Sequence, residues 1–315
     1  MSEPSPTTSP VIVVTGANGL VGSRVCARLV ESGATVRAVV RRPGAEIPAG
    51  VEEWVGEFGD PAFAASVVEG ATGVVTTVHP MGSDRDTQHR VAVEGTPVLA
   101  RAARDAGVER LVHVSTAAVY DRSPSAGDVD ESSALVGEDA DDYAATKRDT
   151  DAALADVDGL TRVLVRPPAI LGAGETSVWN ALRPAAIRDE ESARHAVPEQ
   201  TFSWVHVDDL AGLVADLATG RIATSDDPEH GPVEGGCTAV NAAAGPATVR
   251  DYYETVTRAV GVEPLWDDAP AWTGQILNDR ARGWGWVPAV GPATALAEID
   301  AGLRGAQGDD PAAGR

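Results

Sequence analysis

Four side chains near the middle of the chain could transfer protons. Tyr143 and Lys147 lie four residues apart in the strongly helical segment DDYAATKRDTDAAL, so both project from one helix face. The run RLVHVSTAAVY begins as a buried strand and places Ser115 and Thr116 at its carboxyl end. An ammonium beside a phenol favours the phenolate, so we expect the pKa of Tyr143 to fall below its usual value of about 10. A hydroxyl, a phenol and an ammonium together suit general acid–base chemistry.

A glycine-rich turn near the N-terminus is a second, independent feature. The run VIVVTGANGLVGSRVCARLV predicts an apolar strand, a tight turn and an amphipathic helix between residues 11 and 30. Glycines allow backbone N–H groups at a helix N-terminus to approach an anion. The spacing G-x-x-G-x-x-G is a variant of the dinucleotide fingerprint, and the flanking strand and helix that the fingerprint requires are both present. We therefore expect dinucleotide phosphates at this turn, with the candidate contacts Gly16, Asn18, Gly19, Leu20 and Gly22.

The next strand, in ATVRAVVRRP, indicates which dinucleotide binds. A carboxylate at its end would bind the ribose 2′-OH of NAD, but Val40 occupies that position. Arg41 and Arg42 follow, and guanidinium groups suit a 2′-phosphate. The pattern favours NADP(H) over NAD(H), with Arg41 as the first candidate for the phosphate contact. Arg42 is the alternate, or a solvent-facing residue before Pro43.

Five segments, in this order along the chain, resemble the extended short-chain dehydrogenase/reductase superfamily, which includes nucleotide-sugar epimerases and dihydroflavonol-type reductases. TGANGLVG is similar to the family's TGxxGxxG, and YAATK to its YxxxK. The run 93–120 looks like the family's long helix and following strand, and RPPAILGAG and FSWVHVDDLA match two later segments. The chain departs from the family at Ala92, where an Asn is frequent.

The resemblance implies roles for individual residues. Tyr143 would be the general acid/base, Lys147 would hold the nicotinamide ribose, and Thr116, with its neighbour Ser115, would polarise the substrate oxygen. Glu57 in VGEFGD stands where the family places an acid near the adenine, and Pro167 of RPPAILGAG is a further candidate cofactor contact.

Strand-like and helix-like segments alternate through much of the chain. This spacing predicts right-handed crossovers and a Rossmann-type α/β fold with a doubly wound parallel sheet. Strands are expected near 11–15, 35–40, 51–55, 73–78, 110–115 and 160–165, and helices near 20–32, 61–69, 86–106, 141–155 and 207–218.

After Arg166 the alternation gives way to sequence rich in Pro, Gly and Trp, which we interpret as a smaller interleaved substrate lobe. Its tryptophans either pack this lobe or line a substrate cage. We expect disordered tails over 1–9 and 306–315, an NADP-binding domain over 10–170 to which 201–220 and 238–243 return, and the substrate lobe over 171–200 and 221–305.

Charge and composition limit the partners. A net charge of −22 without a basic patch argues against nucleic acid or an anionic membrane. No apolar run approaches the length of a membrane span, and MSEPSPTTSP lacks the features of a signal peptide. Two cysteines offer neither a disulfide framework nor metal-ligand spacing. We expect a cytoplasmic protein with a small-molecule substrate and no metal, and the resemblance implies a homodimer.

Departures from the family bear on the reaction. Sugar-nucleotide dehydratases have Asp-Glu directly after the catalytic Thr, whereas this chain has Ala117 and Ala118. Epimerases usually have an Arg ahead of their L-G-W-x-P element, whereas DAPAWTGQ has none, although Arg280 or Arg282 could substitute. The leading hypothesis is an NADP(H)-dependent oxidoreductase acting on a carbonyl/alcohol pair. The alternatives are a sugar epimerase with a transient keto intermediate and a non-catalytic NADP(H) sensor, a class that tends to lose the Tyr or Lys.

Overall fold

A seven-stranded sheet in the order β10-β6-β5-β4-β1-β2-β3 forms the centre of the first of two compact units. The computed structural model describes residues 9–308; this unit contains residues 9–119, 136–165 and 211–240. Its strands are largely buried and rich in Val, as expected of a parallel sheet covered on both faces. The expected Rossmann-type α/β fold is confirmed. The strands are β1 (Val11–Thr15), β2 (Thr35–Val40), β3 (Glu52–Val55), β4 (Gly73–Thr76), β5 (Arg110–Val114), β6 (Thr161–Arg166) and β10 (Cys237–Asn241).

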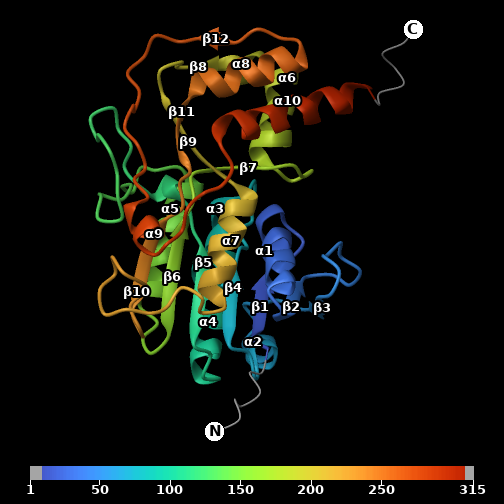
Figure 1. The fold of residues 1–315 in the computed structure, drawn as a ribbon, viewed down its shortest axis with the longest axis vertical. Helices are drawn as coiled ribbons and strands as arrows, with labels where there is room; N and C mark the ends of the chain where they lie inside the picture. Colours follow the sequence, from blue (N-terminus) through green and yellow to red (C-terminus); the bar gives the residue numbers. More distant parts are fainter. Residues whose placement is uncertain (1–8, 309–315) are drawn as a thin grey trace, which may run out of the picture. The chain divides into compact units, whose positions relative to one another are not determined.

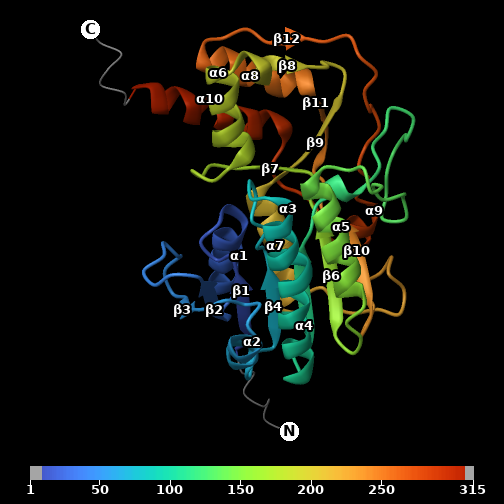
Figure 2. The same cartoon turned by 180° about the vertical axis from the view of Figure 1, so that it is seen from behind.

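Helices cover both faces of this sheet (Figures 1 and 2). On the face toward the viewer in Figure 2, α2, α4 and α5 pack on β4, β5 and β6 around Val67, Leu99 and Leu154, all fully buried. Figure 1 shows α1 and α7 on the opposite face. The first unit thus has three layers, in which the sheet lies between two layers of helices. The helices are α1 (Leu20–Glu31), α2 (Pro61–Val68), α4 (Gly95–Asp105), α5 (Asp142–Ala155), α7 (Val207–Ala218) and the short 3₁₀ turn η2 (Ala117–Val119).

The prediction of one continuous helix over 86–106 is wrong. The structure has α3 (Arg85–Gln88), a π-helical segment η1 (His89–Glu94) and then α4. Gln88, whose side chain is buried, is the last residue of α3 and directly precedes the π segment. Wider π turns interrupt helices mostly as isolated segments and frequently near functional sites, and periodicity in the sequence does not reveal them.

The second unit contains residues 120–135, 166–210 and 241–308 and has its own core. Its three-stranded sheet has the order β11-β9-β7, and β12 pairs with β8. Phe202 stacks on Tyr252, and Trp179 packs edge-on against both, so these rings lie in the unit's apolar core. The strands are β7 (Ala169–Leu171), β8 (His195–Ala196), β9 (Thr201–His206), β11 (Gly245–Thr248) and β12 (Leu265–Trp266). The helices are η3 (Val178–Leu182), α6 (Arg183–Asp189), η4 (Glu191–Arg194), α8 (Val249–Val260), α9 (Asp279–Gly283) and α10 (Pro292–Gly308).

The second unit differs from the sequence-based description in three respects. Residues 201–210 belong to it, because β9 pairs with β7 and β11, while 221–240 belong to the first unit. The Pro-, Gly- and Trp-rich region, for which no helix is predicted, contains the regular helix α8, which begins with a capping box at Thr248 and ends at the left-handed Gly261. Helix α10 includes residues 306–308 of the expected C-terminal tail. Residues 1–8 and 309–315 lie outside the described part of the chain.

No helix within residues 9–308 combines the length and apolar character needed to span a bilayer.

Candidate active site

The glycine turn connects β1 to α1 at the carboxyl end of the sheet. Gly16 has φ +70°, and a Cβ at Gly22 would collide with the carbonyl oxygen of Gly16, so the tight path requires glycine at both positions. Gly19 caps α1 without a side-chain hydrogen bond. The first-turn N–H groups of α1 therefore keep their capacity to bind an anion, and the backbone around them fits a dinucleotide phosphate. Asn18 is exposed on this turn, and Leu20 is the first residue of α1.

The two candidate arginines lie beside this turn. Thr15, which ends β1, pairs with Val39 of β2, so the Gly16 turn and Arg41 leave adjacent strands at the same sheet edge. Arg41 and Arg42 are both exposed. The loop after them is held to β3, because Glu53 accepts hydrogen bonds from the N–H groups of residues 44 and 45 at 2.8 and 3.2 Å. Glu57 is exposed on the loop after β3, and Pro167 follows β6 in the second unit.

The proton-transfer set is brought together where β5 ends and α5 begins. Asp141 caps α5 by accepting a hydrogen bond from Ala144 N–H, which starts the helix just ahead of Tyr143. Lys147, only 3% exposed, donates from Nζ to the carbonyl oxygen of Val114 at 2.8 Å. A hydrogen bond joins Thr116 to the Tyr143 phenol. The expected residues Thr116, Tyr143 and Lys147 are thus neighbours.

Thr116 is oriented by the 3₁₀ turn that follows β5. Its Oγ1 accepts a hydrogen bond from Ala118 N–H at 3.1 Å, so its own O–H is left to donate toward the phenol oxygen. Ser115 is also buried, but its Oγ has no hydrogen-bond partner among the described residues. Of the two adjacent hydroxyls, the one on Thr116 is engaged with Tyr143.

The electrostatics of the pair correct one expectation. Burial is the main cause that raises the pKa of Tyr143, and the carboxylates of Asp141 and Asp151 raise it further, while the hydrogen bond from Thr116 opposes them. The Lys147 ammonium, which is directed at Val114, does not lower the phenol pKa below its usual value as the sequence suggested. Burial also lowers the pKa of Lys147 to about 8, against the opposing charge of Asp151.

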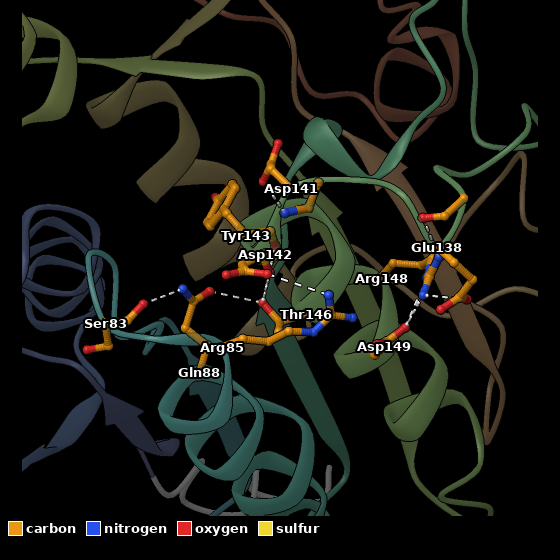
Figure 3. A network of polar contacts seen from close by, with 12 residues as sticks. Ser83, Arg85, Gln88, Glu138, Asp141, Asp142, Tyr143, Thr146, Arg148 and Asp149 are labelled. Carbon is orange, nitrogen blue, oxygen red and sulfur yellow. Dashed lines mark hydrogen bonds and ion pairs between the residues drawn. The ribbon is translucent and has the colours of Figure 1, made fainter.

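A polar cluster that the sequence analysis missed borders Tyr143. The His79 ring lies edge-on to the phenol ring, with centroids 4.9 Å apart, and its Nε2 lies 2.9 Å from Gln88 Oε1. Gln88 also contacts Ser83 and Thr146, and Figure 3 shows its side chain reaching toward α5 beside Tyr143. His79 follows β4 at the carboxyl edge of the sheet, where polar side chains commonly face ligands. The position of His79 just after a predicted strand is the feature by which the sequence could have identified it as a site residue.

A second buried histidine lies within the sheet. His113 of β5 has its Nδ1 2.7 Å from Thr76 Oγ1 of β4. Burial, followed by the charge of Lys147, holds the pKa of His113 well below its usual range. His113 is therefore neutral at working pH and contributes packing beneath Lys147. Within residues 9–308, no group of His, Cys, Asp and Glu side chains could hold a metal ion.

Helix α5 is further held by Arg148. Its guanidinium donates to the carbonyl oxygens of Val136 and Gly137, both at 2.9 Å, and pairs with Glu138 and Asp149 (Figure 3). These contacts attach the incoming segment to the helix that presents Tyr143.

A family model described as "NAD dependent epimerase/dehydratase family" matches residues 12–221. Among curated relatives, 4-hydroxy-2-methyl-3-oxo-4-farnesyl-3,4-dihydroquinoline-1-oxide ketoreductase from Stigmatella aurantiaca is 34% identical over 202 residues, which cover 61% of this chain and 56% of the relative. The chain spans about half the length of the curated relatives it matches.

Two solved structures show the same fold. A short-chain dehydrogenase/reductase superfamily protein from Agrobacterium tumefaciens with bound NAD has a TM-score of 0.74 and 24% identity, over 94% of this chain and 98% of that one. UDP-glucose 4-epimerase from Thermotoga maritima with UDP-glucose has a TM-score of 0.72 and 17% identity, over 94% and 99%.

Proposed function

Because the chain belongs to the NAD dependent epimerase/dehydratase family, we propose that it is an NADP(H)-dependent oxidoreductase that interconverts a carbonyl and an alcohol. Family membership confirms the resemblance to extended short-chain dehydrogenases/reductases. The observation that supports the proposal most is the hydrogen bond between Thr116 and Tyr143 beside the buried Lys147. A ketoreductase among the relatives favours this chemistry over the alternatives.

The chain's own residues would move the proton. A bound nicotinamide cofactor would supply the hydride for the carbonyl carbon in the reducing direction. Tyr143, kept protonated by its raised pKa, gives its phenol proton to the carbonyl oxygen and becomes phenolate. The Thr116 hydroxyl stabilises that phenolate through the hydrogen bond that already joins them. Lys147 provides the nearby positive charge, and its pKa of about 8 allows it to exchange protons near neutral pH.

The cofactor preference is the second part of the proposal. Arg41, with Arg42 as the alternate, would pair with a 2′-phosphate at the edge of the sheet next to the glycine turn. Val40, buried at the end of β2, leaves that position without the carboxylate that would bind a 2′-OH. Glu57 is a candidate contact near the adenine, and Pro167 is a further candidate cofactor contact.

An epimerase would use the same Thr116, Tyr143 and Lys147, and the likeness to the Thermotoga maritima epimerase is one of fold. The experiment that separates the hypotheses follows NADPH absorbance and product identity with a panel of apolar ketones and of nucleotide sugars. Net NADPH oxidation with a ketone supports the proposal. Isomer exchange without net oxidation identifies an epimerase, and cofactor binding with neither identifies a sensor.

We also propose that the protein is a cytoplasmic homodimer that pairs through the 86–106 segment, which contains η1 and α4, and through α5. The apolar residues Val91, Val98 and Ala102 contact the first unit's core while partly exposed, whereas α5 presents charged residues. The charge of −22 opposes association but is screened by salt. Light scattering at physiological salt is expected to give twice the 32.4 kDa of one chain, and a concentration-independent mass of one chain contradicts the dimer.

A further inference from the structure

His79 contacts Tyr143 but has no part in the proton transfer described above. It stands three residues beyond the end of β4, and its ring meets the phenol ring at an interplanar angle of 88° with the centroids 4.9 Å apart. Such T-shaped pairs have a preferred geometry, so the imidazole restricts the plane that the phenol ring can adopt. At this separation the imidazole also covers part of the phenol ring.

Gln88 fixes the imidazole in one tautomer. The Gln88 side-chain amide donates from Nε2 to the Ser83 carbonyl oxygen at 2.8 Å, which assigns Oε1 to the side of His79. His79 Nε2 therefore donates to Gln88 Oε1 at 2.9 Å, and Nδ1 is the atom without a proton. Thr146 Oγ1 also contacts Gln88 Oε1, at 3.1 Å, and shares its single proton with the Asp142 carbonyl oxygen at 2.6 Å.

The bridge from His79 through Gln88 to Thr146 ends on the helix that carries Tyr143. Thr146 lies between Tyr143 and Lys147 on α5, so the loop after β4 is attached to α5 within one turn of the phenol. Figure 3 shows Gln88, Thr146 and Tyr143 grouped at this end of the helix. The ring contact and the hydrogen-bonded bridge thus hold the same two elements together.

The imidazole stays neutral in this setting. His79 Nδ1 is buried and has no hydrogen-bond partner among the described residues, so a second proton would create an unpaired buried N–H. Burial, followed by the charge of Lys147 on α5, lowers the pKa of His79 to about 4, and the hydrogen bond to Gln88 opposes this. Its other titratable neighbours are the Tyr143 phenol, which its ring contacts, and the neutral His113 on β5. His79 therefore contributes a ring and a hydrogen bond at working pH, without a charge.

We propose that His79 is a positioning residue for Tyr143: held by Gln88, its ring fixes the plane of the phenol and shields it from water. This inference rests on the proposed role of Tyr143 as general acid/base. Thr116 after β5 hydrogen-bonds the phenol, and the ring of His79 after β4 packs against it. The charges of Asp141 and Asp151 also act on its pKa. Among these groups, His79 is the one whose aromatic ring packs on the phenol ring.

The test compares His79→Ala, which removes ring and hydrogen bond, with His79→Phe, which keeps a ring of similar shape. His79→Ala is expected to lower kcat about tenfold to a hundredfold, as a displaced catalytic group does, while the Kd for NADPH changes less than twofold. Because water then reaches the phenol, its pKa falls, and the loss of activity at high pH moves to lower pH. His79→Phe is expected to restore the alkaline limb and most of kcat. His89→Ala, at an exposed histidine of η1, is the matched control and should change nothing.

Three results would overturn the proposal: an unchanged kcat in His79→Ala, an unchanged alkaline limb in that variant, or a loss of NADPH affinity as large as the loss of kcat. If no carbonyl compound is turned over, the proposed function fails separately. The inference is then decided by the ultraviolet titration of the Tyr143 phenol, taken as the difference between each variant and its Tyr143→Phe counterpart. A lower phenol pKa in His79→Ala than in His79→Phe supports it, and equal values overturn it.

Discussion

The two units hold their buried basic side chains differently. In the first unit, the Lys147 ammonium is buried and its hydrogen bond goes to a backbone carbonyl, that of Val114. In the second unit, the buried His206 has Glu298 at 3.0 Å on one side and Asp208 at 3.7 Å on the other. His206 accepts a hydrogen bond from Asp208 N–H at Nδ1 and contacts Glu298 through Nε2, which fastens β9 to α10. An ammonium held by a neutral carbonyl, in contrast, can still respond to a developing anion. The comparison separates a group bound into the fold from the one that we propose takes part in the reaction.

Tyr143→Phe is the sharpest way to break this comparison. The substitution removes only the phenol oxygen that exchanges the proton, so turnover should fall by about 10² to 10⁴ while NADPH binding persists. Initial rates on a verified ketone and fluorescence titration of NADPH measure the two quantities. Near-full activity in this variant would remove Tyr143 from the chemistry.

Lys147→Met tests whether the buried ammonium of the first unit lowers the free energy of unfolding. The pKa of Lys147 in the folded state, about 8, lies below the ordinary lysine value of 10.5, so the unfolded chain binds more protons between these pH values. Stability should therefore rise with pH from about 8 to 10.5 in the unmutated protein, and this rise should be smaller in Lys147→Met. At pH 7 we expect the variant to be more stable by roughly 1–3 kcal/mol and to lose turnover. Urea denaturation across this pH range measures the effect, and a less stable variant would show that the ammonium stabilises the fold.

Arg41→Ala tests the cofactor end of the same unit. One charge-assisted contact to the 2′-phosphate contributes about 1.5–3 kcal/mol, so the NADPH preference over NADH should shrink roughly tenfold or more. Fluorescence titration with both cofactors measures it, with Arg42→Ala as the matched neighbour. Equal affinities for NADPH and NADH in the unmutated protein would contradict the assignment.

Glu298→Gln should have the smallest effect, and it tests the contact between His206 and Glu298 in the second unit. The amide can still accept the hydrogen bond from His206, and Glu298 is partly exposed, so the free energy of unfolding should fall by less than about 1 kcal/mol. Turnover should be unchanged. Thermal unfolding and a rate assay check both, and a clear loss of turnover would give this pair a role in function.

The sequence predicted the first unit well because its signals are local. Strand β1, the glycine turn and α1 follow one another within 21 residues, and each has its own pattern of apolar residues and glycines. Tyr143 and Lys147 could be paired because a helix places residues four apart on one face. The position of Thr116 followed from its place at the end of β5.

The unpredicted features depend on contacts between distant residues. His79 meets Tyr143, 64 positions away in the chain, and no local pattern indicates that contact. The raised pKa of Tyr143 comes from burial, which the sequence around it does not specify. In the second unit, β9 joins β7 and β11 through pairings that FSWVHVDDLA alone does not favour over a return to the central sheet.

The π segment after Gln88 sets the rotational phase between two stretches of one long helix. The α4 stretch is fixed by packing on the sheet through Leu99, while the α3 stretch must direct Gln88 at Thr146. Each residue in an α-helix advances the side-chain direction by about 100°, so deleting one residue within 89–94 would rotate Gln88 by that angle relative to Leu99. A chain one residue shorter here would keep its core and lose the Gln88 bridge between the loop after β4 and α5. We therefore expect insertions and deletions at this point to act on the orientation of Tyr143 from outside its own helix.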